Sequence, residues 1–157
     1  MRYGPGRFPE TLKLLTMAKM KQPQDTDTFR FYNANPKGRK TGDCVIRAIS
    51  AFLGESWETT YRALAEMGVK YGTMLNCPET FVRFLKSRGY EKKPMPRTVC
   101  GTKYTGEQFC REIAEPGTCY LVSMANHVTF IGPDCRIHDI WNCGEKCVGN
   151  YWTRKMK

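Results

Sequence analysis

Residues 39–50 read RKTGDCVIRAIS, and they join a basic, glycine-containing loop to an apolar helical pattern. Apolar residues recur at the three- and four-residue spacing of an amphipathic helix, at Val45, Ile46, Ile49, Phe52 and Leu53. Asp43 stands at a favourable N-cap position, and Gly54 follows the last apolar residue of the run. The stretch therefore predicts a helix that begins at Cys44 and ends before Gly54.

Cys44 would lie in the first turn of this helix. The unpaired N–H groups and the dipole of a helix N-terminus favour negative charge, so they lower the pKa of a thiol placed there. The position suits an activated nucleophile. A small apolar thiol that faces the core would show the same local pattern, so the stretch alone leaves both interpretations open.

Further helices are predicted on both sides of this stretch, at 9–21, 57–68, 77–89 and 105–117. A short extended segment is predicted at 29–32. After Gly117 the sequence is rich in β-branched and aromatic residues, and strands are predicted near 118–124, 127–132, 135–141 and 147–153. Helices followed by an antiparallel sheet indicate an α+β fold.

The chain has two histidines, His127 and His138. His127 begins an apolar strand, NHVTFI, and Asp139 follows it by twelve residues in RIHDIWN. The GPD turn between the two strands predicts a hairpin, and pairing across it would bring His127 beside Asp139. A carboxylate there would orient the imidazole and stabilise its charged form. The pair predicts a general base for Cys44, and a purely structural histidine is the alternative.

Three motifs occur in the chain order of the papain-like cysteine peptidases, which the sequence resembles over residues 30–153. GDCVIRAIS looks like the segment with the family's cysteine at the start of its central helix, and NHVTFI looks like the segment with its histidine. DIWNCG is similar to the family's Asn-x-Trp-Gly segment, with Asp139 at the Asn position and Trp141 at the Trp position. The overall sequence pattern is similar to that of small members of this family from phages and prophages.

The resemblance implies a papain-like α+β fold, in which N-terminal helices with Cys44 at a helix start pack on a C-terminal antiparallel sheet. It implies a cysteine peptidase that cleaves a peptide or isopeptide bond through Cys44, His127 and Asp139, by way of an acyl-enzyme. Trp141 would lie at the substrate cleft. The expected partner is a protein or peptide substrate, and no cofactor is expected.

The sequence departs from this family at the oxyanion donor. Papain-like enzymes place a glutamine a few residues before the cysteine, and none stands there in this chain. Asn35 and Asn33, in YNANPKG, carry side-chain amides, and Asn35 is the preferred donor together with the backbone N–H of Cys44. Loop capping beside Pro36 is the alternative role for both asparagines.

Two other functions fit the same residues. A thiol acyltransferase or transglutaminase-like enzyme would use the same triad, because the acceptor decides the outcome. A non-catalytic basic module that binds nucleic acid or protein, with or without zinc, is the other alternative. Its zinc ligands would be Cys135, His138, Cys143 and Cys147, although Cys135 and His138 would point to opposite faces of one strand.

Length and charge suit one basic domain of 157 residues with a net charge of +10. The predicted division is a basic arm at 1–28 and a papain-like catalytic domain at 29–157. The arm is a candidate contact for nucleic acid, since residues 1–40 carry nine basic and three acidic residues. No apolar run approaches the roughly 20 residues of a membrane span, and no signal-peptide pattern is present. A cytoplasmic location is therefore expected, in the bacterial host cell if the chain is phage-encoded, with no disulfide framework.

Overall fold

The computed structural model describes residues 22–156, which form four helices and five strands. In chain order these are β1 (Phe29–Phe31), α2 (Cys44–Leu53), α3 (Trp57–Tyr71), α4 (Pro78–Ser87), α5 (Gly106–Glu112), β2 (Thr118–Met124), β3 (His127–Ile131), β4 (Ile137–Asp139) and β5 (Val148–Lys155). The helices pack on a five-stranded mixed sheet, which confirms the α+β class. The helix predicted at 9–21, like most of the predicted basic arm at 1–28, lies outside the described residues.

The strand order of the sheet is β1-β4-β3-β2-β5. The first strand runs parallel to β4, with Phe31 opposite Asp139, and the other neighbouring pairs are antiparallel. The four C-terminal strands are thus antiparallel as predicted, but the sheet as a whole is mixed, because β1 joins its edge in parallel. A three-residue strand whose partner lies more than a hundred residues away leaves no local sign of its pairing, and fully buried Phe29 anchors it only in the folded chain.

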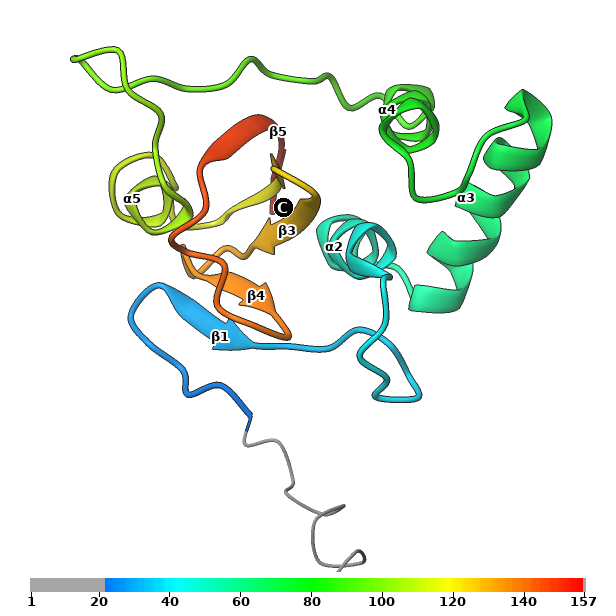
Figure 1. Cartoon of the computed structure of the whole chain (residues 1–157), viewed down its shortest axis with the longest axis horizontal. Coiled ribbons are helices and arrows are strands. Elements are labelled where there is room, and N and C mark those ends of the chain that lie inside the picture. The colour runs from blue at the N-terminus through cyan, green and yellow to red at the C-terminus, as the bar shows by residue number, and fades with distance from the viewer. Residues whose placement is uncertain (1–21, 157) are drawn as a thin grey trace, which may run out of the picture.

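Figure 1 shows the sheet between two unequal helical layers, with α2, α3 and α4 on one side and α5 on the other. Alternate residues of β2 enter two separate apolar clusters, as expected for a strand that is covered on both faces. Cys119 and Leu121 pack in the cluster with α2 and α4, whereas Tyr120 and Val122 pack in the cluster with α5. The helix α2 packs against β3, and the first residues of these two elements, Cys44 and His127, line one cleft.

The helix ends follow the capping residues that the sequence contains. Gly54 ends α2 in the left-handed conformation, with φ of 70°. The Ser56 side chain accepts a hydrogen bond from the Thr59 N–H at the start of α3. Thr105 and Gln108 form a reciprocal capping box at the start of α5. The predicted helices downstream of Gly54 are confirmed, with ends displaced by a few residues.

The predicted strand at 135–141 is confined to Ile137–Asp139. Cys135 has a φ of 58°, so it belongs to the turn that follows Gly132 rather than to extended backbone. Trp141 lies beyond the end of β4, in the segment that leads to β5. Asp139 is thus the last residue of its strand, next to a loop that can shape a site.

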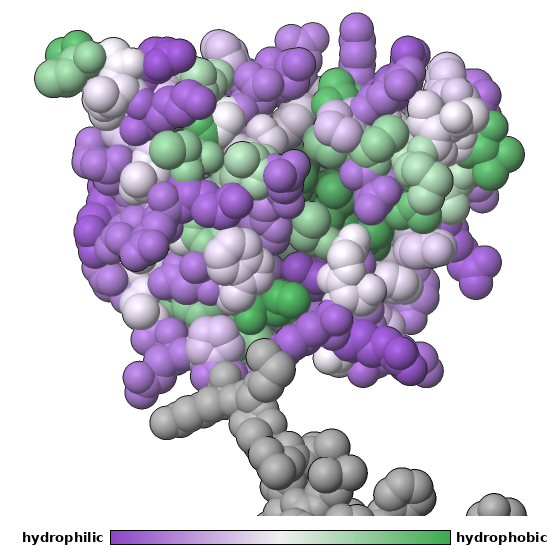
Figure 2. Space-filling model, viewed as in Figure 1, coloured by the Kyte–Doolittle hydropathy of each residue, from purple (hydrophilic) through white to green (hydrophobic). Residues whose placement is uncertain are grey.

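The surface of the molecule is mainly polar. Figure 2 shows hydrophilic residues over most of the face viewed, with the hydrophobic residues gathered chiefly on the side of the helices α2, α3 and α4. Within residues 22–156, no helix combines the length and the apolar character that crossing a bilayer requires.

Candidate active site

Cys44 is the first residue of α2, and its side chain is half-buried. The N-cap residue, Asp43, does not cap the helix with its side chain, because its carboxylate is bound elsewhere. The helix N-terminus therefore keeps its dipole and donors for another negative group. A thiolate at Cys44, in the first turn of the helix, would be stabilised by them.

His127 and Asp139 meet at the end of the β3–β4 pair. The imidazole Nε2 lies 2.8 Å from the Asp139 Oδ2, and the two side chains are almost completely buried. The hydroxyl of Thr129 donates to the same oxygen at 2.8 Å, and the N–H of Ile140 donates to the Oδ1 at 2.7 Å. The carboxylate is thus fixed from several sides and holds one nitrogen of the ring, which leaves the other nitrogen for Cys44.

The three groups shift one another's ionisation. Burial by itself would raise the pKa of the Cys44 thiol, but its hydrogen bond with His127 and the backbone N–H of Val128 lower that pKa below the usual value. Burial would lower the pKa of His127, but its hydrogen bonds with Asp139, Cys143 and Cys44 raise the pKa to about 11. Burial would also raise the pKa of Asp139, yet the bond with His127 keeps that pKa low. All three shifts therefore act in the direction of a thiolate, an imidazolium and a carboxylate.

The raised pKa of His127 predicts how stability depends on pH. A group whose pKa rises on folding stabilises fully below its unfolded pKa, here 6.5, and this stabilisation is lost as the pH climbs toward about 11. We expect His127→Gln to lower the free energy of unfolding by at least about 1 kcal/mol more at pH 6 than at pH 9.5. Urea unfolding at the two pH values measures the difference. A deficit that is equal at both values, or one matched by His138→Gln, would contradict this expectation.

Cys44 and His127 line one cleft of about 450 Å³. Its walls include apolar side chains at Val45, Pro78, Phe81, Met124 and Val128. Asn76 and Asn126 add amide groups to the same cleft. The Trp141 ring lies 5.0 Å from the His127 ring, and 41% of its surface is exposed. The cleft can therefore hold an apolar side chain while its amides hydrogen-bond a polar backbone.

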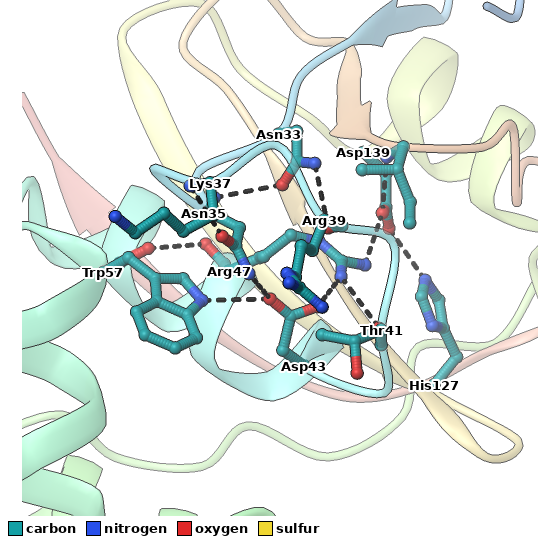
Figure 3. Close-up of polar contacts among 12 residues, drawn as sticks. Asn33, Asn35, Lys37, Arg39, Thr41, Asp43, Arg47, Trp57, His127 and Asp139 are labelled. Carbon is teal, nitrogen blue, oxygen red and sulfur yellow. Dashed lines mark hydrogen bonds and ion pairs between the residues drawn. The ribbon is translucent and has the colours of Figure 1, made fainter.

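Neither asparagine predicted as an oxyanion donor turns toward Cys44. The Asn35 amide donates to the Asp43 carboxylate at 3.0 Å, and the Asn33 amide donates to the backbone oxygen of Arg39. Both side chains organise the loop before α2, which is the alternative that the sequence also allowed (Figure 3). The prediction of Asn35 as the oxyanion donor is corrected on this ground, because its amide is already used by a buried carboxylate.

The alternative zinc ligands do not converge. Cys135 contacts the backbone oxygen of Ala114, and the His138 Nε2 lies 2.8 Å from an Asp134 oxygen. Cys143 is buried and Cys147 is exposed. None of the eight cysteines, all of which the structure describes, is joined in a disulfide.

Within residues 22–156, one group offers three ligand atoms to a metal ion, namely His127, Asp139 and Cys143, whose atoms lie within 4.8 Å of one another. The Arg47 guanidinium lies 3.2 Å from the Asp139 Oδ1, and its positive charge opposes a cation at that position. The hydrogen bond between His127 and Asp139 already accounts for the proximity of these two groups. The donors thus suit proton transfer better than metal binding.

One residue of the site, Arg47, was not predicted from the sequence, and a second, Cys143, was predicted only as an alternative zinc ligand. Arg47 is 5% exposed and contacts both Asp43 and Asp139. Its position among the apolar residues of the α2 pattern is the signal that could have revealed a buried charge. The Cys143 sulfur lies within 4.8 Å of ligand atoms of His127 and Asp139, and only the fold distinguishes it from the other cysteines of its segment.

The chemistry of the cleft rests on a half-buried thiol at a helix start, an imidazole beside it and a buried carboxylate behind the imidazole. Such an arrangement can form and break a covalent bond to a carbonyl carbon. Comparisons with protein-family models, with curated proteins and with solved structures found no match to this chain.

Proposed function

We propose that this protein is a cysteine peptidase of papain-like arrangement, a thiol hydrolase that cleaves a peptide or isopeptide bond. The observation that carries the proposal is the position of His127, which lines one cleft with Cys44 and holds its Nε2 2.8 Å from the Asp139 carboxylate. The N-terminus of α2 and the open cleft add the electrostatics and the space that acyl transfer requires.

The reaction begins with the thiolate–imidazolium pair. The Cys44 sulfur attacks the carbonyl carbon of the scissile bond, and the carbonyl oxygen becomes an oxyanion. The C–N bond then breaks as His127 gives its proton to the leaving amine, so a thioester to Cys44 remains. Neutral His127 next takes a proton from water, and the hydroxide attacks the thioester. The acid product leaves, and the sulfur and the protonated ring return to their first state.

The backbone N–H of Cys44, at the unoccupied helix N-terminus, is the proposed donor to the oxyanion. The amides of Asn76 and Asn126 line the cleft and are suited to hydrogen bonds with the substrate backbone. The Trp141 ring lies beside the His127 ring, with the centroids 5.0 Å apart, and is suited to limit the access of water to the bond with Asp139.

Selective alkylation tests the activated thiol. We expect limiting iodoacetamide at about pH 6 to label Cys44 ahead of the exposed thiols Cys100 and Cys147, because of these three only Cys44 has its pKa lowered by an imidazole. Peptide mapping by mass spectrometry identifies the labelled site. Uniform slow labelling of several cysteines would refute the activated nucleophile.

Turnover tests the reaction itself. Incubation with a mixture of synthetic peptides should give new peptide termini that are absent with Cys44→Ser. Adding a primary amine distinguishes hydrolysis from transfer, since a transferase would yield the amide of the acyl fragment at the expense of the acid. A folded protein that is labelled at Cys44 but forms no acyl-enzyme with any peptide in the mixture would count against the peptidase.

A further inference from the structure

A chain of buried charges connects the nucleophile's helix to the triad carboxylate. Arg47 lies on α2, one turn after Cys44, and one of its terminal nitrogens forms an ion pair with Asp43. Its other terminal nitrogen lies 3.2 Å from the Asp139 Oδ1 on β4. The three residues are only 4% to 5% exposed. One guanidinium thus bridges two buried carboxylates from different elements (Figure 3).

The Asp43 end of this bridge is itself fixed. The Asp43 Oδ2 accepts hydrogen bonds from the Trp57 Nε1 and the Asn35 Nδ2, each at 3.0 Å. These donors come from α3 and from the loop before α2, so the carboxylate cannot follow a moving Arg47 side chain. Because the carboxylate is held, the guanidinium is held too, and its free end is aimed at Asp139.

Arg47 and His127 divide the Asp139 carboxylate between them. The guanidinium takes the Oδ1 and the imidazole takes the Oδ2. The Asp139 oxygens therefore face Arg47 from α2 and His127 from β3, while the His127 ring also faces Cys44 and Cys143. Without the guanidinium, two carboxylates would remain buried with one fewer cation, and a buried carboxylate in that state favours its protonated form. A protonated Asp139 could no longer stabilise the imidazolium.

We propose that Arg47 is a positioning residue of the thiol site, which keeps Asp139 charged and turned toward His127 and ties the helix of Cys44 to the strand of Asp139. The proposal rests on the proposed function, because it concerns the ionisation of the Cys44–His127 pair. Arg47 acts through its contact with Asp139, its positive charge also favours the Cys44 thiolate directly, and it needs no contact with the substrate.

The pH dependence of Cys44 alkylation tests this proposal. We expect Arg47→Met to move the midpoint of the rate–pH profile upward by about 1 pH unit, because the imidazolium that holds the thiolate loses its charged partner. Arg47→Lys retains the charge but cannot contact both carboxylates, so its midpoint should lie between those of the wild type and Arg47→Met. The downfield proton signal of a His127 imidazolium bonded to a carboxylate should weaken in the same order.

Two further variants keep the result interpretable. Arg88→Met removes an arginine whose ion pair with Glu55 lies away from the cleft, and it should leave the midpoint unchanged. If Arg47→Met does not fold, Asp43→Asn/Arg47→Met removes one anion together with the cation, and it should fold with the raised midpoint. A wild-type midpoint in a folded Arg47 variant would overturn the proposal. By contrast, a wild-type protein without an acid-shifted profile would refute the proposed function itself.

Discussion

Replacing His127 by alanine is expected to slow the alkylation of Cys44 at pH 6 by about 10²-fold. The hydrogen bond and the positive charge of His127 lower the pKa of the Cys44 thiol, whereas burial acts in the opposite direction. Removal of the imidazole leaves burial opposed only by the Val128 N–H and the charge of Arg47, so the fraction of thiolate at this pH falls. The rate is measured by quenching the alkylation at a series of times and quantifying the labelled Cys44 peptide by mass spectrometry. Peptide cleavage should be lost completely.

The second histidine supplies a matched control. His138 lies on the neighbouring strand, bonded to Asp134 and packed edge-on against Phe130. Its replacement by alanine should leave the Cys44 rate within about 2-fold of the wild type, since its ring does not contact the thiol. Equal slowing by both substitutions would indicate a general loss of structure and would remove His127 from the role of base.

Replacing Asp139 by alanine is expected to lower the free energy of unfolding by about 3–5 kcal/mol at pH 7. The substitution removes the partner of two buried groups, Arg47 and His127, and leaves the Thr129 hydroxyl without its acceptor. Because the pKa of Asp139 is held below 3.8, its stabilisation is present above that value and disappears as the pH falls through the folded pKa. The difference between the variant and the wild type should therefore shrink in acid. Urea unfolding at pH 7 and at about pH 2.5, well below the unfolded pKa of 3.8, measures it.

Asp134 is the matched control for this carboxylate. It binds His138 at 2.8 Å and Arg136 at 3.1 Å, but its side chain is 29% exposed and water can replace its partners. Asp134→Ala should therefore cost about 1 kcal/mol or less. An Asp139→Ala variant as stable as Asp134→Ala would show that the buried charges at Asp139 are compensated in some other way, and it would weaken the network derived from Arg47.

Much of the fold was readable from short patterns. The start of α2 at Cys44 and its end at Gly54 follow from residues within one helix, and the strand at 118–124 has the predicted ends. The neighbours His127 and Asp139 followed from the turn between two strands, because a tight connection restricts which residues can meet across a hairpin. Each of these features depends on residues fewer than about fifteen positions apart, a separation at which chain geometry leaves few arrangements.

The remaining features depend on packing between distant parts of the chain. The strand that contains Phe29 pairs with β4, more than a hundred residues away. A three-residue segment contains no pattern that identifies this partner. The Asn35 amide could donate a hydrogen bond to an oxyanion, but in the folded chain it donates to the Asp43 carboxylate instead. The sequence shows that a side chain such as the Asn35 amide can donate a hydrogen bond. Only the fold determines which acceptor lies within reach of it.

RKTGDCVIRAIS by itself determined that a thiol stands at the beginning of a helix, because capping and apolar spacing are local properties. The tertiary structure decided which charged groups pair with one another around the start of this helix. It turns the Asp43 carboxylate away from the N-terminus and toward Arg47, and it places the other end of Arg47 against Asp139, ninety-two residues further along the chain. The physical reason is that a buried charge must find a partner of opposite sign, and which partner is within reach is fixed only when α2 packs on the sheet.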